Sequence, residues 1–419
     1  MKNGGAYARE ISQGGVTLLA ATIAYGSGSA LFMYAANLIV LPLEKGTGWS
    51  RGDIALGLSM LLIVNAIALP IVGRLVDRFG PRPIGLASLA GYGGCCALLA
   101  LNPFGLKGYY GVMLAISLFF PGTSAVVYAR VVAARFVHLR GTALAVMYSG
   151  TAIILGLIAA TLTSSMAERG FQAGYVMLGG IAILLGLPTA LLAMRGGPQN
   201  PAPRSLPADP DDGLSLAQAL RTPAFWQVSL AIFASASALG GILNQLAPVL
   251  AERGLSPAEV ALMASLFAAS VVGGRLLAGF LLDTLNPGIV AGGLMLAAAL
   301  GILLLLQAPT TMLVCAIFVA LIGCAMGAEA DFAAFMSAHY FGRASYSAIL
   351  GSVLAFISAG LAGSTYLYGT WYDSSGTYNL ALQFSIAAFL VSSLIFASLY
   401  AQRPFARVRL AETLKSGLV

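Results

Sequence analysis

Residues 73–82 read GRLVDRFGPR and connect two long apolar runs. Gly73 has no side chain and lets another helix approach closely, and Gly80 begins a tight turn. The charged pair Asp77 and Arg78 can bind or cap the end of a neighbouring helix. The stretch therefore predicts a helical hairpin whose charged turn lies at the edge of a membrane.

The composition of the whole chain agrees with this interpretation. It is 59% hydrophobic and 9% charged, with a mean hydropathy of +0.88, whereas soluble domains carry about 25% charged residues. Apolar runs recur at lengths that match the ~20 residues needed to cross a bilayer. We predict twelve spans, at roughly 15–41, 53–73, 83–102, 108–134, 142–163, 172–194, 222–247, 258–282, 288–308, 310–336, 345–368 and 378–400.

The net charge of +7 follows membrane topology and does not indicate a nucleic-acid partner. If the N-terminus is cytoplasmic, 15 of the 22 Lys and Arg residues fall on the cytoplasmic side, five on the opposite side and two inside spans. This is the positive-inside bias. We expect a multi-pass protein of the plasma (inner) membrane with both termini in the cytoplasm.

One segment without an apolar span divides the chain into two halves. Residues 196–220 contain GGPQNPAPRSLPADPDDG and are expected to form a cytoplasmic linker, with a short helix at 214–220. The linker separates a six-helix half at 1–195 from a second six-helix half at 221–419, which ends in a short basic tail.

The two halves also repeat each other. GRLVDRFG at Gly73 matches GFLLDTLNPG at Gly279, an offset of 206, and RFVHLRG at Arg135 matches HYFGRAS at His339, an offset of 204. Such repeats are common in secondary transporters. The expected fold is an all-α membrane protein with two six-helix bundles related by a pseudo-two-fold axis along the membrane normal.

Four charged residues lie inside otherwise apolar runs: Arg130, Arg275, Glu329 and Asp331. Each such group costs at least a few kcal/mol in a bilayer, so it is rarely incidental. Because two are positive and two negative, they suggest a shared polar cavity.

Arg275 lies eight residues before Asp283, about 12 Å from the helix end at ~1.5 Å per residue. That depth exceeds the reach of a snorkelling side chain. Its guanidinium could bind a substrate carboxylate through two hydrogen bonds. The alternative is a structural ion pair with Glu329 or Asp331.

Glu329 lies ten residues before His339, at a depth similar to that of Arg275. Glu329 and Asp331 are two residues apart and so point in different directions around a helix. A buried carboxyl can take up a proton when a nearby arginine is drawn to substrate. Either acid is a candidate proton-coupling site, and a permanent ion pair is the alternative for both.

The stretch 73–82 resembles the signature between spans 2 and 3 of the major facilitator superfamily, G-x-x-x-D-R/K-x-G-R/K-R/K, with Pro81 in place of one basic residue. In that superfamily the signature governs the switch between outward-open and inward-open states. The resemblance implies that Asp77 and Arg78, with the two glycines of the motif, gate the carrier without touching substrate.

Three more stretches resemble bacterial relatives of the monocarboxylate transporters and the oxalate:formate antiporter. They are GTGWSRGDIAL at 46–56, RTPAFW at 221–226 and RLLAGFLLD at 275–283. The last is similar to an R-P-x-x-G-F-x-x-D run whose arginine binds the substrate carboxylate, which implies that role for Arg275. Val271 stands where the animal transporters have a proton-coupling aspartate. Ile357 stands where the oxalate transporter has a lysine for a second carboxylate, which favours a monocarboxylate.

The same resemblance implies that span 4 lines the transport pathway, together with spans 1, 7 and 10. Arg130 could then line the cavity, although it could equally reach the cytoplasmic face or form a salt bridge there. The other expected substrate-binding residues are Tyr128, Asn244 and Tyr34. Each could instead simply bond a neighbouring helix.

The sequence gives no indication of an enzyme, a metal site or a cofactor. The four cysteines all fall in predicted spans, and the two histidines, His138 and His339, lie far apart in the sequence. We predict a monomeric transporter that moves a small lactate- or pyruvate-like monocarboxylate with a proton by alternating access. The alternatives are an organic-anion exchanger, a multidrug proton antiporter or, from another class, a membrane receptor or an integral-membrane enzyme.

Overall fold

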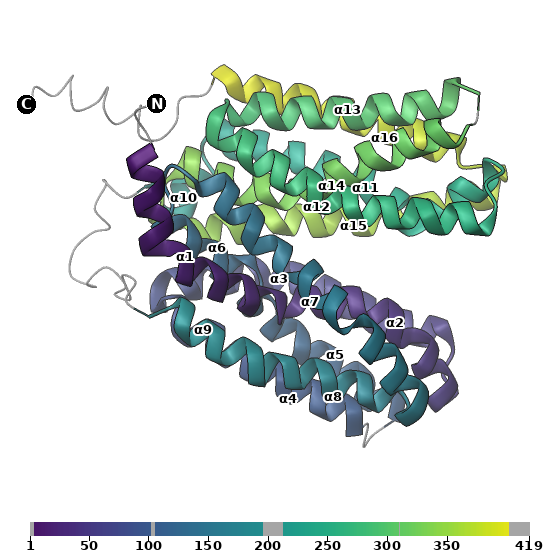
Figure 1. Cartoon of the computed structure of the whole chain (residues 1–419), viewed down its shortest axis with the longest axis horizontal. Coiled ribbons are helices and arrows are strands. Elements are labelled where there is room, and N and C mark those ends of the chain that lie inside the picture. The colour runs from purple at the N-terminus through teal and green to yellow at the C-terminus, as the bar shows by residue number, and fades with distance from the viewer. Residues whose placement is uncertain (1–3, 102–104, 196–212, 310, 402–419) are drawn as a thin grey trace, which may run out of the picture. The chain divides into compact units, whose positions relative to one another are not determined.

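The computed structural model describes residues 4–101, 105–195, 213–309 and 311–401 of the 419-residue chain. The chain is almost entirely helical within these ranges (Figure 1). It forms two compact units. One holds the described residues of 1–212 together with 344–352, and the other holds those of 213–343 and 353–419.

The helices of the first unit begin and end at residues with a clear structural reason. Ser50 starts α3 with a capping box, because its hydroxyl accepts from the Asp53 backbone N–H (3.1 Å) and the Asp53 carboxylate accepts from the Ser50 N–H (3.2 Å). Gly80 ends the same helix at φ 86°, which favours glycine. The helices are α1 (Gly4–Gly26), α2 (Ser29–Thr47), α3 (Arg51–Phe79), α4 (Pro81–Leu101), α5 (Gly105–Phe119), η1 (Phe120–Thr123), α6 (Ala125–Arg135), α7 (Arg140–Arg169), α8 (Phe171–Ile181), η2 (Ala182–Gly186) and α9 (Leu187–Ala193).

The first predicted span is bent. Helices α1 and α2 meet at 40°. A Cβ atom on Gly28 would lie 2.7 Å from the Thr123 carbonyl oxygen, so this position needs a glycine. The Ser29 N–H then donates to the Thr123 hydroxyl (3.0 Å), which satisfies a backbone group that the bend leaves without a helical partner.

Two further spans contain an irregular turn. Pro121 and Gly122 fall in the 3₁₀ turn η1, which joins α5 to α6 within one apolar span. The π-helical turn η2 precedes Pro188. Proline has no N–H to donate to the carbonyl four residues earlier, which accounts for the local widening of the helix.

The helices of the second unit also begin at capping residues. Thr222 accepts from the Phe225 N–H (3.3 Å) at the start of α11, and Ser256 forms a capping box with Glu259 at the start of α12. Figure 1 shows α13 and α16 side by side within this unit, where they make extensive contact. The helices are α10 (Leu216–Ala219), α11 (Pro223–Glu252), α12 (Pro257–Thr284), α13 (Pro287–Gln307), α14 (Met312–Phe341), α15 (Tyr346–Ser375), α16 (Asn379–Ser398) and η3 (Leu399–Ala401).

The predicted number of spans is confirmed. Eleven helices in the described residues are long and apolar enough to cross a membrane, and the bent pair α1–α2 brings the number to twelve. Residues 196–212 of the predicted linker and the basic tail at 402–419 lie outside the described residues. The predicted short helix at 214–220 is a single turn, α10, and the Leu214 N–H beside it donates to the Phe341 carbonyl (2.8 Å).

Candidate functional site

Arg275 lies next to a close approach of α12 and α14. A Cβ atom on Gly274 would clash with the Cα atom of Cys324, and one on Gly327 would clash with the Val271 carbonyl. Only residues without a side chain allow this approach, so the two glycines set the spacing of the helix pair. The guanidinium of Arg275 is thereby placed against α14, the helix that carries both buried acids.

Arg275 and Asp331 form a loose ion pair. The Nε atom of Arg275 lies 4.0 Å from Oδ2 of Asp331, and their side chains are 12% and 0% exposed. Neither oxygen of Asp331 accepts a hydrogen bond within the described part of the chain. A two-pronged arginine–carboxylate pair would satisfy both oxygens at once, so the two charges are close without being locked together.

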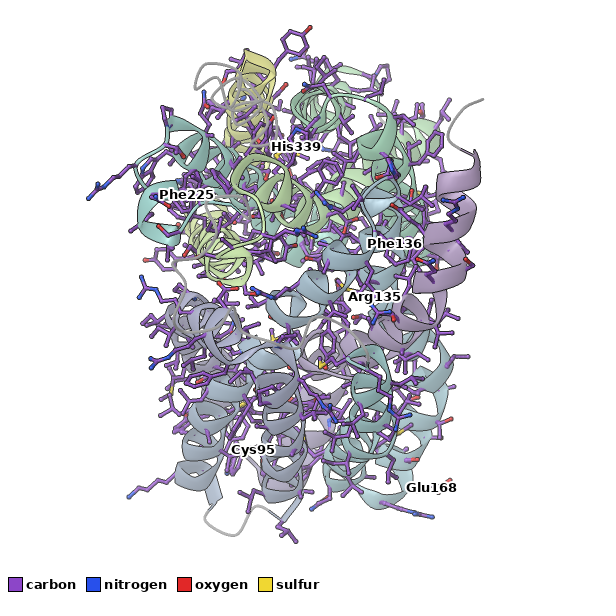
Figure 2. The ribbon with its side chains drawn as sticks, turned by 90° about the vertical axis from the view of Figure 1, so that its left-hand side faces the viewer. Cys95, Arg135, Phe136, Glu168, Phe225 and His339 are labelled. Carbon is purple, nitrogen blue, oxygen red and sulfur yellow. The ribbon has the colours of Figure 1, made fainter. Side chains whose placement is uncertain are left out.

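Glu329 contacts a different helix. Its Oε1 atom lies 2.5 Å from the Ser235 hydroxyl of α11, and its side chain is 4% exposed. The rings of Phe225 and Phe341 are 6.1 Å apart, so α11 begins at the end of the unit where α14 finishes. Phe225 and His339, which Figure 2 labels, mark these two helix ends. Because Ser235 and Glu329 lie ten and twelve residues from the ring pair, they share a depth of about 15–18 Å.

The two acids therefore face different partners, as their spacing on one helix predicts. Glu329 bonds Ser235 on α11, and Asp331 faces Arg275 on α12. The ion-pair alternative for Arg275 thus involves Asp331 and leaves Glu329 outside it.

A second charged cluster lies in the first unit, around Asp77. Its Oδ1 atom accepts from the Ser347 N–H (3.1 Å) and its Oδ2 atom from the Ala348 N–H (2.8 Å). Asp77 thus caps the first turn of α15 at the end of the helix that favours negative charge. Arg130 of α6 forms an ion pair with the same carboxylate.

Arg130 therefore belongs to the Asp77 cluster, which is the salt-bridge alternative to a substrate-binding role. Arg78 has a different environment: its side chain is exposed, and its guanidinium lies 5.2 Å from the centre of the Phe79 ring. Gly73 packs so tightly on α15 that an added Cβ atom would clash with the Ser347 carbonyl.

The other predicted polar residues do not form one cluster with these groups. Tyr128 is fully buried in α6, and its hydroxyl has no hydrogen-bond partner in the described residues. Tyr34 on α2 is 46% exposed. The side chain of Asn244 lies outside the described part of the structure. In the ranges that the structure covers, no group of three or more His, Cys, Asp or Glu side chains could hold a metal ion.

Sequence reasoning missed two partners of these charged groups. Ser235 is one of several serines in α11, and nothing in the sequence distinguishes it until the helix pairing is known. The N–H groups of Ser347 and Ala348 carry no side-chain signal, although the start of a helix is a predictable site for an anionic group.

The apolar helices with charged residues at their centres define the class of protein: a multi-pass membrane protein with polar groups inside the spans. The sequence matches the Major Facilitator Superfamily over residues 18–363. The chain therefore belongs to the major facilitator superfamily and is a secondary transporter.

Solved structures of this superfamily have the same fold. The fucose:proton symporter FucP of Escherichia coli is 16% identical, with a TM-score of 0.73 over 94% of this chain and 99% of that one. The human organic anion transporter MFSD10 is 14% identical, with a TM-score of 0.66 over 93% and 99%. The proton:xylose symporter XylE is 14% identical, with a TM-score of 0.63 over 96% of each chain. No protein of curated function matches this sequence.

Proposed function

We propose that the protein moves a small organic monocarboxylate together with a proton. The observation that carries this proposal is the pair of Arg275 and Asp331, opposite charges inside apolar helices at 4.0 Å, with an acid that accepts no hydrogen bond in the described residues. Arginine suits carboxylate binding because its planar donors match the two carboxylate oxygens. The proton symporters of similar fold, FucP and XylE, support the coupling mode.

Charge balance explains why anion and proton would travel together. In the empty carrier, the charges of Arg275 and Asp331 cancel. When a monocarboxylate draws the guanidinium toward itself, Asp331 is left as an uncompensated charge at 0% exposure. Such a charge is costly, and a proton on Asp331 removes the cost. The loaded site is again neutral, so substrate and proton each favour binding of the other.

The Asp77 cluster is the proposed gate of the carrier. Asp77 holds the first turn of α15 and pairs with Arg130, and Gly73 permits the close packing that brings these groups together. Gly80 ends α3 at the same turn, next to the exposed Arg78. We infer that release of this cap accompanies the switch between states, without contact with substrate.

Uptake of radiolabelled lactate into liposomes that contain the purified protein tests the transport proposal. An inward proton gradient should drive accumulation by the wild type. Arg275→Ala should reduce uptake about ten- to a hundredfold, the loss expected for a charge-assisted hydrogen bond, and Arg275→Lys should restore only part of it. Arg253→Ala is the matched control, because Arg253 bonds Asn379 at an exposed helix end. Normal accumulation by Arg275→Ala would refute the anion site.

The same liposomes separate symport from anion exchange. A symporter accumulates lactate from a proton gradient with no lactate inside, whereas an exchanger needs a trapped anion to leave. The departures from the oxalate transporter pattern favour a substrate with one carboxylate, so oxalate should compete poorly with lactate.

A further inference from the structure

The Ser235 hydroxyl lies within hydrogen-bonding distance of two oxygens at once. Its Oγ atom is 2.5 Å from Oε1 of Glu329 and 2.9 Å from the carbonyl oxygen of Ile232. A serine hydroxyl has one hydrogen and can donate only one of these bonds. If the hydrogen points to Ile232, the short contact to Glu329 requires a proton on the carboxyl, which then donates to Oγ. If Glu329 is ionised, the hydroxyl turns and donates to it.

No cation compensates the charge of Glu329 in the described residues. Helices α11, α12 and α13 pack against α14, and α16, which has no ionisable side chain, contacts it through the rings of Phe332 and Phe396 at 5.9 Å. Helix α13 has no ionisable side chain, and Arg275 on α12 is paired with Asp331. The remaining ionisable groups on these helices and on α14 itself are Glu252, Glu259, Asp283, Cys315, Cys324, His339 and Tyr340.

A buried carboxyl without a counter-ion is far less costly when it is protonated. Glu329 is 4% exposed, and Ser235 is fully buried beside it. When Glu329 is protonated, its O–H donates to Ser235 Oγ and the Ser235 O–H donates to the Ile232 carbonyl. Both hydroxyl hydrogens are then bonded. In the ionised state, one charge-assisted bond from Ser235 remains. The serine can therefore serve both protonation states by rotation of a single bond.

We propose that Ser235 is a positioning residue that holds an exchangeable proton on Glu329, and that these two side chains form a second proton-binding position of the carrier. This inference rests on the proposed proton-coupled function, in which Asp331 takes the proton linked to substrate. The proton on Glu329 differs from the proton on Asp331, because no arginine competes for the Glu329 carboxyl. Its release depends on water reaching the contact between α11 and α14, so it responds to helix separation rather than to anion binding.

Infrared difference spectroscopy of the purified protein in lipid tests this without any transported solute. A protonated carboxyl has a carbonyl stretching band distinct from the amide bands. We expect one such band at neutral pH that is absent in Glu329→Gln and persists in Asp331→Asn and Arg275→Ala. It should disappear reversibly as the pH is raised. Ser235→Ala should move the band to higher frequency, because a hydrogen bond weakens the carbonyl stretch, and Ser235→Thr should restore its position.

Ser237→Ala is the matched control on the same helix. The Ser237 hydroxyl bonds the Phe233 carbonyl (2.7 Å) in the way that Ser235 bonds Ile232, and its removal should leave the band unchanged. The proposal is overturned if Glu329→Gln removes no band at any pH, if the band never titrates in the folded protein, or if Ser235→Ala leaves its frequency unaltered. Failure of lactate transport with a normal titrating band would refute the proposed substrate and leave the proton position standing.

Discussion

Glu329 and Asp331 are two residues apart on one helix, with nearly equal burial, and yet they have different chemical surroundings. Asp331 is 4.0 Å from an arginine and accepts no hydrogen bond in the described residues, whereas Glu329 has a serine hydroxyl at 2.5 Å. The helical rotation of about 100° per residue causes this difference. In the proposed mechanism, Asp331 responds to the anion and Glu329 to the packing of its helix.

Substitution of the two acids should separate these roles. Asp331→Asn keeps the shape of the side chain but cannot change charge. The stimulation of lactate uptake by a proton gradient should therefore fall tenfold or more, which corresponds to about 1.4 kcal/mol. Lactate exchange should continue. Glu329→Gln should retain substrate-linked coupling through Asp331. The measurement is initial uptake rate against external pH in liposomes. An unchanged pH response in Asp331→Asn would contradict the assignment.

Among the helices, glycines decide which pairs can pack with their backbones close together. A Cβ atom added to Gly73 of α3 would clash with the Ser347 carbonyl of α15, and one added to Gly351 of α15 would lie 2.5 Å from the Leu69 carbonyl oxygen. The first turn of α15 is thus held by close packing as well as by the Asp77 carboxylate.

Gly73→Ala should weaken this contact. The added methyl group would meet the Ser347 carbonyl and lie 2.8 Å from the Cα atom of Ala348, so the helices must separate at a cost of about 1–3 kcal/mol. We expect a lower melting temperature and an altered transport rate with little change in lactate affinity. Gly52→Ala on the same helix is the control, because its nearest neighbour is Ser50 Oγ at 3.6 Å. Equal melting temperatures for the two variants would contradict the role of Gly73.

At the scale of the whole molecule, the sequence predicts the span count because apolar length alone decides whether a segment can cross a bilayer. It does not predict the bend between α1 and α2 or the π turn before Pro188. These depend on contacts made only in the folded unit, such as Thr123 with Ser29. The two-unit division is also more complex than a cut at the linker, since residues 344–352 group with the first half.

Part of the candidate site could also be predicted from the sequence. Buried charges are visible in a sequence because they interrupt apolar runs, which is how Arg275, Glu329 and Asp331 were found. Their partners are set by helix pairing across long sequence distances, so the choice of Asp331 over Glu329 for Arg275 required the structure. Ser235 could not be distinguished from other serines for that reason.

Proton uptake on addition of lactate tests the link between the anion site and Asp331, because the measurement needs neither a gradient nor a membrane. A pH indicator in weakly buffered solution would report protons taken up by purified protein as lactate binds. We expect up to about one proton per lactate bound in the wild type near neutral pH, none in Asp331→Asn, and greatly weakened lactate binding in Arg275→Ala. Lactate binding by the wild type without proton uptake at any pH, or undiminished binding by Arg275→Ala, would contradict this link.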